Sequence, residues 1–112
     1  MVMPNPIPMG LAELIAARMR VIGDPNRIRI LDQLRRGELS VNEITESLDT
    51  SQQNVSKHLG VLHQAGIVGR RKEGTSSLYR VIDEGVFDLC EQICGGLQEQ
   101  AAELVELVGG AR

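Results

Sequence analysis

Residues 51–62, SQQNVSKHLGVL, decide the fold of this 112-residue chain. Val55, Leu59 and Leu62 recur at intervals of three and four residues, which is the spacing of one buried helix face. Polar side chains gather in the first half of the stretch, where they can project outward. The sequence therefore predicts a short amphipathic helix that is anchored to a core by one face.

The polar half of this helix predicts a surface for DNA. Amide and hydroxyl side chains read base edges in the major groove, and lysine or a helix N-terminus holds phosphate. A polar N-terminal half on a core-anchored helix is typical of a recognition helix. For this stretch alone, an ordinary amphipathic surface helix is the alternative. The predicted DNA contacts are Ser51, Gln52, Gln53, Asn54, Ser56, Lys57 and His58.

A basic hairpin is predicted directly after this helix. Gly66 is available for a left-handed C-terminal cap. Residues 67–72 and 77–81 are predicted to be strands on either side of a glycine turn at residues 73–76. We interpret the hairpin as a wing along the DNA backbone, with a solvated charged hairpin as the alternative. Its predicted contacts are Arg71, Lys72 and Thr75, and its charges are Arg70, Arg71, Lys72 and Arg80 against Glu73.

Two helices are predicted upstream. Asp24 is an N-cap before Pro25, and a buried face of Ile28, Ile30, Leu31 and Leu34 follows as far as Gly37. Ser40 and Glu43 have the spacing of a capping box, which opens a short helix through Leu48. A turn then leads to the recognition helix, with Thr50 or Ser51 as its cap. This order of elements predicts a mostly α winged helix-turn-helix with a small β-hairpin.

Four segments resemble the ArsR/SmtB family of bacterial repressors: residues 23–31, 37–44, 51–59 and 62–68. The resemblance covers roughly residues 12–82, and it is specific because all four segments occur in order with matching spacing. It implies a homodimeric repressor that binds a palindromic double-stranded DNA operator near its own promoter. It also implies release of DNA when an inducer, often a metal ion, binds.

Length and charge agree with one small regulatory domain. We expect a flexible arm over residues 1–10, a domain over 11–108 and a tail over 109–112. The net charge is −3, but residues 51–80 carry five basic residues against one acid, whereas residues 81–112 carry seven acids against one arginine. The acidic end should therefore face away from DNA.

The N-terminal arm and the rest of the chain predict a cytoplasmic protein with no membrane partner. Residues 1–10 contain three prolines and no basic cluster, unlike a signal peptide. No apolar stretch reaches the length of a membrane span. Cysteines in that compartment are reduced by default.

The first and last helices, residues 11–22 and 83–108, are predicted to form the dimer. The last helix carries a stripe, at intervals of three and four residues, that one small domain cannot cover. Its members are Phe87, Cys90, Ile93 or Cys94, Leu97, Ala101, Leu104 and Val108. Gly95 and Gly96 interrupt it, at about 1 kcal/mol each relative to alanine. A close helix approach or a bend would explain them.

We do not expect the effector to be a standard metal ion of the family. At the positions where relatives carry ligands, this chain has Ser40, Asn42, Ala101 and Leu104, and Asp88 is followed by Cys90 instead of histidine. No metal site or cofactor is therefore predicted, and the inducer stays open.

Cys90 and Cys94 lie one helical turn apart. They are candidate regulatory thiols for redox or sulfur sensing. They are alternatively soft-metal ligands shared across a dimer, or two small buried apolar residues.

An enzyme and a protein-binding module are the two other classes of function. Cys90 or Cys94 with His58 or His63 would supply a nucleophile and a base. No third orienting group or oxyanion site accompanies them, so no enzyme and no catalytic residue is predicted. A winged helix that binds another protein instead of DNA is the remaining alternative.

Overall fold

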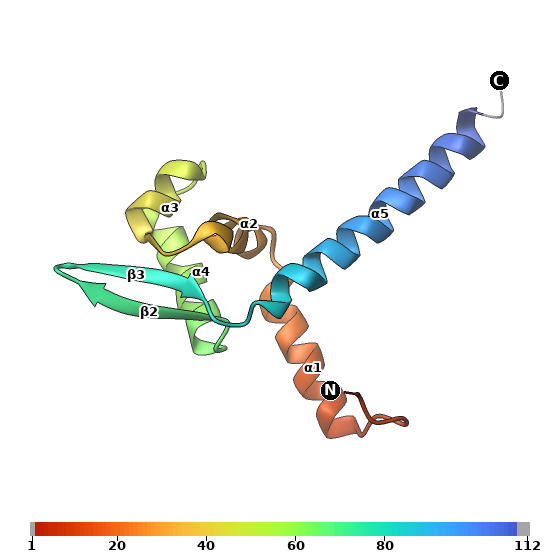
Figure 1. The fold of residues 1–112 in the computed structure, drawn as a ribbon, viewed down its shortest axis with the longest axis horizontal. Coiled ribbons are helices and arrows are strands. Elements are labelled where there is room, and N and C mark those ends of the chain that lie inside the picture. Colours follow the sequence, from red (N-terminus) through yellow and green to blue (C-terminus); the bar gives the residue numbers. More distant parts are fainter. Residues whose placement is uncertain (1, 110–112) are drawn as a thin grey trace.

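The computed structural model describes residues 2–109, and its first three helices are α1 (Met9–Ile22), α2 (Pro25–Gln33) and α3 (Val41–Ser47). A 3-10 turn, η1 (Leu34–Arg36), and a short strand, β1 (Leu39–Ser40), lie between α2 and α3. Next come α4 (Gln52–Gln64), the strands β2 (Val68–Glu73) and β3 (Ser76–Val81), and the long helix α5 (Gly85–Gly109). The predicted order of helix, short helix, helix and hairpin is confirmed (Figure 1).

Local capping signals set the helix starts. The Asp24 carboxylate accepts from the backbone N–H groups of Asn26 at 2.8 Å and Arg27 at 3.2 Å. Ser40 and Glu43 make both halves of the capping box. Ser51, rather than Thr50, caps α4 by accepting from the backbone N–H of Asn54. These side chains satisfy backbone donors that the first helical turn leaves unpaired.

The hairpin turns through Gly74, whose φ is 62°. None of the non-glycine residues that the structure describes has positive φ, so Thr75 completes a two-residue loop with the single positive φ of a type II′ turn. β2 and β3 pair antiparallel from Val68↔Val81 to Glu73↔Ser76. Strand β1, which was not predicted, adds to the other side of β3, so the sheet order is β1-β3-β2.

The core lies between α2, α3, α4 and the base of the hairpin. Its fully buried side chains include Ile30, Leu31, Ile44, Val55, Leu59, Leu62, Ile67 and Val68. The prediction for Ile28 was wrong, because this side chain is 41% exposed. It faces a crevice between α2 and α5 instead of the core.

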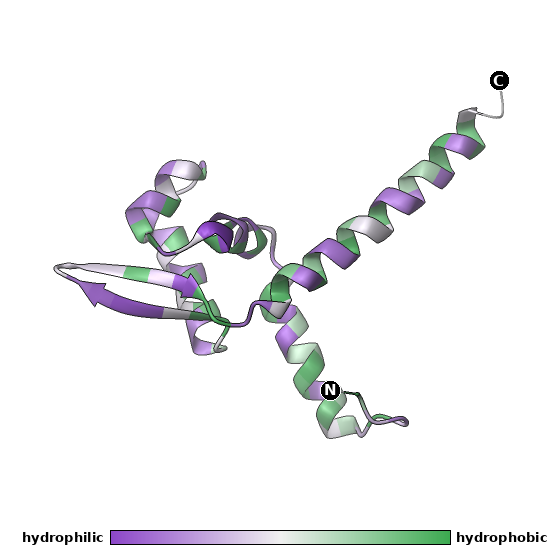
Figure 2. Ribbon diagram, in the orientation of Figure 1, coloured by the Kyte–Doolittle hydropathy of each residue, from purple (hydrophilic) through white to green (hydrophobic). Residues whose placement is uncertain are grey.

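Helix α5 projects away from the body of the protein, and α1 leaves the body in another direction (Figure 1). Val86 is the only buried residue of α5. Green apolar positions continue along α5 well beyond the body (Figure 2). The radius of gyration is accordingly 17.7 Å, against about 13 Å for a compact chain of this length.

Three predicted boundaries shift. The helix α1 begins at Met9, within the predicted arm, and α5 begins at Gly85 rather than residue 83. Asp83 instead pairs with Arg18 of α1 at 3.1 Å. Gly109 still belongs to α5, while Met1 and residues 110–112 of the predicted tail lie outside the described residues. The helix runs unbroken through Gly95 and Gly96.

Candidate nucleic-acid interface

Helix α4 has one buried face and one exposed face. Val55, His58, Leu59 and Leu62 are buried. The exposed positions Gln53, Ser56, Lys57 and Gly60 follow the i, i+3, i+4, i+7 spacing of a single strip, with Gln52 beside it. The core contacts therefore aim a polar strip away from the body of the protein.

His58 does not lie on the exposed strip, so the prediction that it faces DNA was wrong. Its side chain is 6% exposed, and its Nδ1 lies 3.2 Å from NH1 of Arg27 in α2. A guanidinium only donates hydrogen bonds, so Nδ1 accepts and the ring proton belongs on Nε2. The spacing of His58 from Val55 and Leu62 explains this burial, because those intervals of three and four residues place all three on one face.

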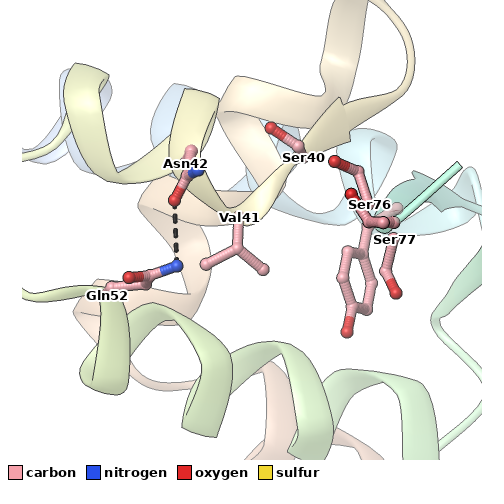
Figure 3. Close-up of a pocket in the computed structure, with 8 residues that line it drawn as sticks. Ser40, Val41, Asn42, Gln52, Ser76 and Ser77 are labelled. Carbon is pink, nitrogen blue, oxygen red and sulfur yellow. Dashed lines mark hydrogen bonds between the residues drawn. The ribbon is translucent and has the colours of Figure 1, made fainter. Parts of the chain in front are cut away.

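The first turn of α4 is already engaged by protein groups. The Ser51 hydroxyl serves as the cap, and Asn54 Nδ2 donates to Thr50 Oγ1 at 2.8 Å. Gln52 Nε2 donates to Asn42 Oδ1 of α3 at 2.9 Å (Figure 3). These bonds fix the start of the helix against the preceding turn and against α3.

A polar depression of about 240 Å³ lies between the starts of α3 and α4 and the tip of the hairpin. In Figure 3 hydroxyl and amide side chains from the two helices and from β3 surround it. Hydroxyl and amide groups line it beside the Val41 side chain and the Tyr79 ring. These hydrogen-bond donors and acceptors suit the sugar-phosphate backbone of a duplex. The lining residues are Ser40, Val41, Asn42, Gln52, Thr75, Ser76, Ser77 and Tyr79.

The strand register divides the basic residues of the hairpin between two faces. Arg70 pairs with Tyr79 and Lys72 with Ser77, and paired residues share one face of a sheet. Tyr79 and Ser77 line the polar depression, so Arg70 and Lys72 lie on the face that turns toward α3 and α4. Lys72 is exposed on this face.

Arg71 lies on the opposite face and is bound to two carboxylates. Its Nε donates to Glu38 at 2.9 and 3.1 Å, and its NH2 donates to Glu38 at 2.8 Å. The same NH2 is 3.0 Å from Glu73. The hydrogen bonds from Arg71 hold the pKa of Glu38 below its usual value, and those to Glu38 raise the pKa of Arg71. An acid outside the hairpin thus compensates part of the hairpin charge, which sequence reasoning missed.

The two cysteines are in different surroundings. Cys90 is half-buried in the crevice between α2 and α5, beside Phe87 and Leu31. Cys94, one turn further, is exposed. Across residues 2–109 no three His, Cys, Asp or Glu side chains are grouped so that they could hold a metal ion.

Membrane insertion has no candidate helix in the described part of the chain, where none combines sufficient length with sufficient apolar character.

Comparison with known proteins identifies the family. Residues 24–69 match the family described as bacterial regulatory protein, arsR family. The chain is 35% identical to the HTH-type transcriptional regulator KmtR of Mycobacterium tuberculosis, over 77% of this chain and 66% of KmtR.

Two solved structures are similar along most of their length. M. tuberculosis Rv0081 gives a TM-score of 0.74 at 31% identity, covering 85% of this chain and 96% of that one. The homodimeric winged helix-turn-helix domain Mb0332 of Mycobacterium bovis, a possible ArsR-family regulator, gives 0.67 at 30% identity, covering 87% and 86%. The chain therefore belongs to the ArsR family of bacterial transcriptional regulators, which carry a DNA-binding winged helix-turn-helix.

Proposed function

We propose that this protein is a homodimeric repressor of a palindromic operator, which it reads with α4 and holds with the hairpin. One observation carries the proposal. A helix anchored by its apolar face presents Gln53, Ser56 and Lys57 in one exposed strip, beside a polar depression and an exposed Lys72. As a regulator of bacterial genes, it would act in the cytoplasm.

The contacts divide between bases and backbone. Gln53 and Ser56 project from the middle of the exposed strip and are assigned to base edges. Lys57, Lys72 and Thr75 are assigned to phosphate. Ser51, Gln52 and Asn54 lie at the helix N-terminus, where their existing bonds would orient the backbone N–H groups toward phosphate. Arg71, which is bound to Glu38, would hold the wing in place.

The dimer would form through α1 and α5. Both helices expose large apolar side chains: Leu14 and Met19 in α1, and Ile93, Leu97, Leu104, Val105, Leu107 and Val108 in α5. Arg18 of α1 forms an exposed ion pair with Asp83, two residues before the start of α5. Apart from the adjacent residues and backbone of α5 itself, no atom of residues 2–109 lies within 4 Å of a Cβ built at Gly95 or Gly96, so a second copy could approach α5 closely there. The homodimeric relative Mb0332 supports this assembly.

The thiols are the candidate effector site. Cys90 touches the crevice beside α2, and Cys94 lies on the exposed part of the proposed dimer helix. A disulfide formed there would release two protons and two electrons to an added oxidant and change the contact between subunits. Binding of a soft metal by the four thiols of a dimer is the second candidate.

The first prediction concerns base reading. Gln53→Ala or Ser56→Ala should weaken binding to an operator, selected from random duplexes with the wild-type protein, by about 1–3 kcal/mol. Binding to random duplex should change little. Titrations of both duplexes, followed by fluorescence anisotropy, would measure this. Ser56 is exposed, so its substitution should alter the free energy of unfolding by less than about 0.5 kcal/mol. Equal losses on both duplexes would contradict a role in reading sequence.

The second prediction concerns the wing. Lys72→Gln should weaken binding to all duplexes and reduce the slope of log affinity against log salt by about one, because one phosphate contact is lost. Arg29→Gln removes the same charge from the crevice beside α5 and should leave the slope unchanged. If the salt slope decreased equally in both variants, the effect of Lys72→Gln would come from net charge and not from a phosphate contact.

The third prediction concerns assembly. Leu97→Asp combined with Leu104→Asp places two charges on one face of α5, and the protein should become monomeric in sedimentation equilibrium. Gln92→Asp, at an exposed position on the opposite face of the same helix, should remain dimeric. The monomeric variant should also lose tight operator binding, since it cannot contact two half-sites together. A dimer that survives the double substitution would place the interface elsewhere.

The fourth prediction concerns the thiols. Treatment with diamide should weaken operator binding by about 5- to 150-fold, the usual range of allosteric coupling. The double variant Cys90→Ser, Cys94→Ser should bind the operator like the reduced wild type and should not respond. A parallel titration with Cd²⁺ separates a soft-metal site from a redox site. If neither reagent distinguishes the variant from the wild type, the cysteines only pack.

A further inference from the structure

His58 is the buried polar residue of the described chain, and it is joined to the N-terminal helix through one arginine. Arg27 NH1 donates to His58 Nδ1 at 3.2 Å, and Arg27 Nε donates to the backbone carbonyl of Val21 at 2.5 Å. Val21 belongs to the last turn of α1, and His58 lies in the middle of α4. A single guanidinium therefore connects the end of α1 to the recognition helix.

The arginine itself is held firmly. Its backbone N–H donates to Asp24, which caps α2, and Pro25 fixes the first position of that helix. Burial disfavours the ionised form of Asp24, but the backbone N–H groups of Arg27 and Asn26 outweigh it, so the pKa of Asp24 lies below its usual value. The cap therefore holds the backbone of Arg27 in place, and the Arg27 side chain extends from there to α4.

A buried apolar residue at position 58 would pack against the core without fixing a direction. A hydrogen bond from a charged donor is directional, so it restricts rotation of α4 about its axis and sliding along it. Lys57 and Ser56 directly precede His58 and lie on the exposed strip. Any rotation that displaced His58 would turn the base-reading side chains by the same angle.

We propose that Arg27 and His58 are positioning residues for sequence reading, which lock the rotation of α4 to the end of α1. The inference rests on the proposed function, because α1 is assigned there to the dimer. Two recognition helices must lie about one duplex turn, roughly 34 Å, apart on a palindrome. A fixed link between the dimer helix and α4 keeps that separation constant.

The test compares two substitutions of His58. His58→Leu fills the site with an apolar side chain and removes the acceptor, whereas His58→Asn places Oδ1 where Nδ1 stood. Affinities are measured for the selected operator, for the same operator with one base pair added between its half-sites, and for random duplex. His58→Leu should bind the operator about 10-fold more weakly than wild type, within the range of coupling effects. It should also lose the discrimination against the lengthened operator, while its affinity for random duplex stays within about 2-fold. His58→Asn should recover most of both properties.

The outcomes separate the positioning role from the proposed function. Suppose that the wild type prefers the operator. The positioning role is then overturned, and sequence reading stands, if His58→Leu retains both that preference and the discrimination against the lengthened operator. The same conclusion follows if His58→Leu and His58→Asn lose these two properties equally. If wild type does not distinguish operator from random duplex, the proposed function is overturned.

A measurement on the wild-type protein covers the case in which His58→Leu does not fold. The ¹⁵N chemical shifts of the His58 ring should show the proton on Nε2 and an accepting Nδ1. A proton on Nδ1 of the neutral ring would remove the hydrogen bond from Arg27 and overturn the positioning role.

Discussion

The burial of one face of α4 is the constraint on which the rest of the arrangement depends. Val55, Leu59 and Leu62 are fully buried, and they decide which side of the helix faces outward. Helices α2 and α3 pack against that face, and the hairpin follows α4 after the turn at Gly66. The position of the polar strip is therefore a consequence of core packing, because a helix that rotated would expose leucine and bury lysine.

Local signals in the sequence predicted most of the fold. Asp24, Ser40 with Glu43, and Gly66 act within a few residues of themselves, so their roles can be read without knowledge of the tertiary structure. The family resemblance placed the same elements in the same order. It also indicated a regulator instead of an enzyme, in agreement with the relatives that the chain matches.

The missed features depend on contacts between distant residues. Glu38 binds Arg71 from 33 residues away, and Arg27 reaches His58 over 31 residues. Strand β1 has only two residues, too few to show a pattern. The burial of His58 was the one case that helical spacing could have revealed, since it shares a face with Val55 and Leu62. Its polar character favoured the opposite interpretation.

Because α5 projects from the body of the protein, the cellular concentration of the protein would affect whether this helix is ordered. A helix with one buried residue in 25 gains little from its own chain, and isolated helices are marginal in water. In the proposed dimer, the order of α5 would therefore depend on association and follow mass action. At low cellular abundance the distal turns would fray and become accessible to proteases, and at higher abundance a second copy would protect them. Synthesis would then raise the lifetime of the repressor as well as its number, and the fraction able to occupy both half-sites would increase more steeply than the total concentration.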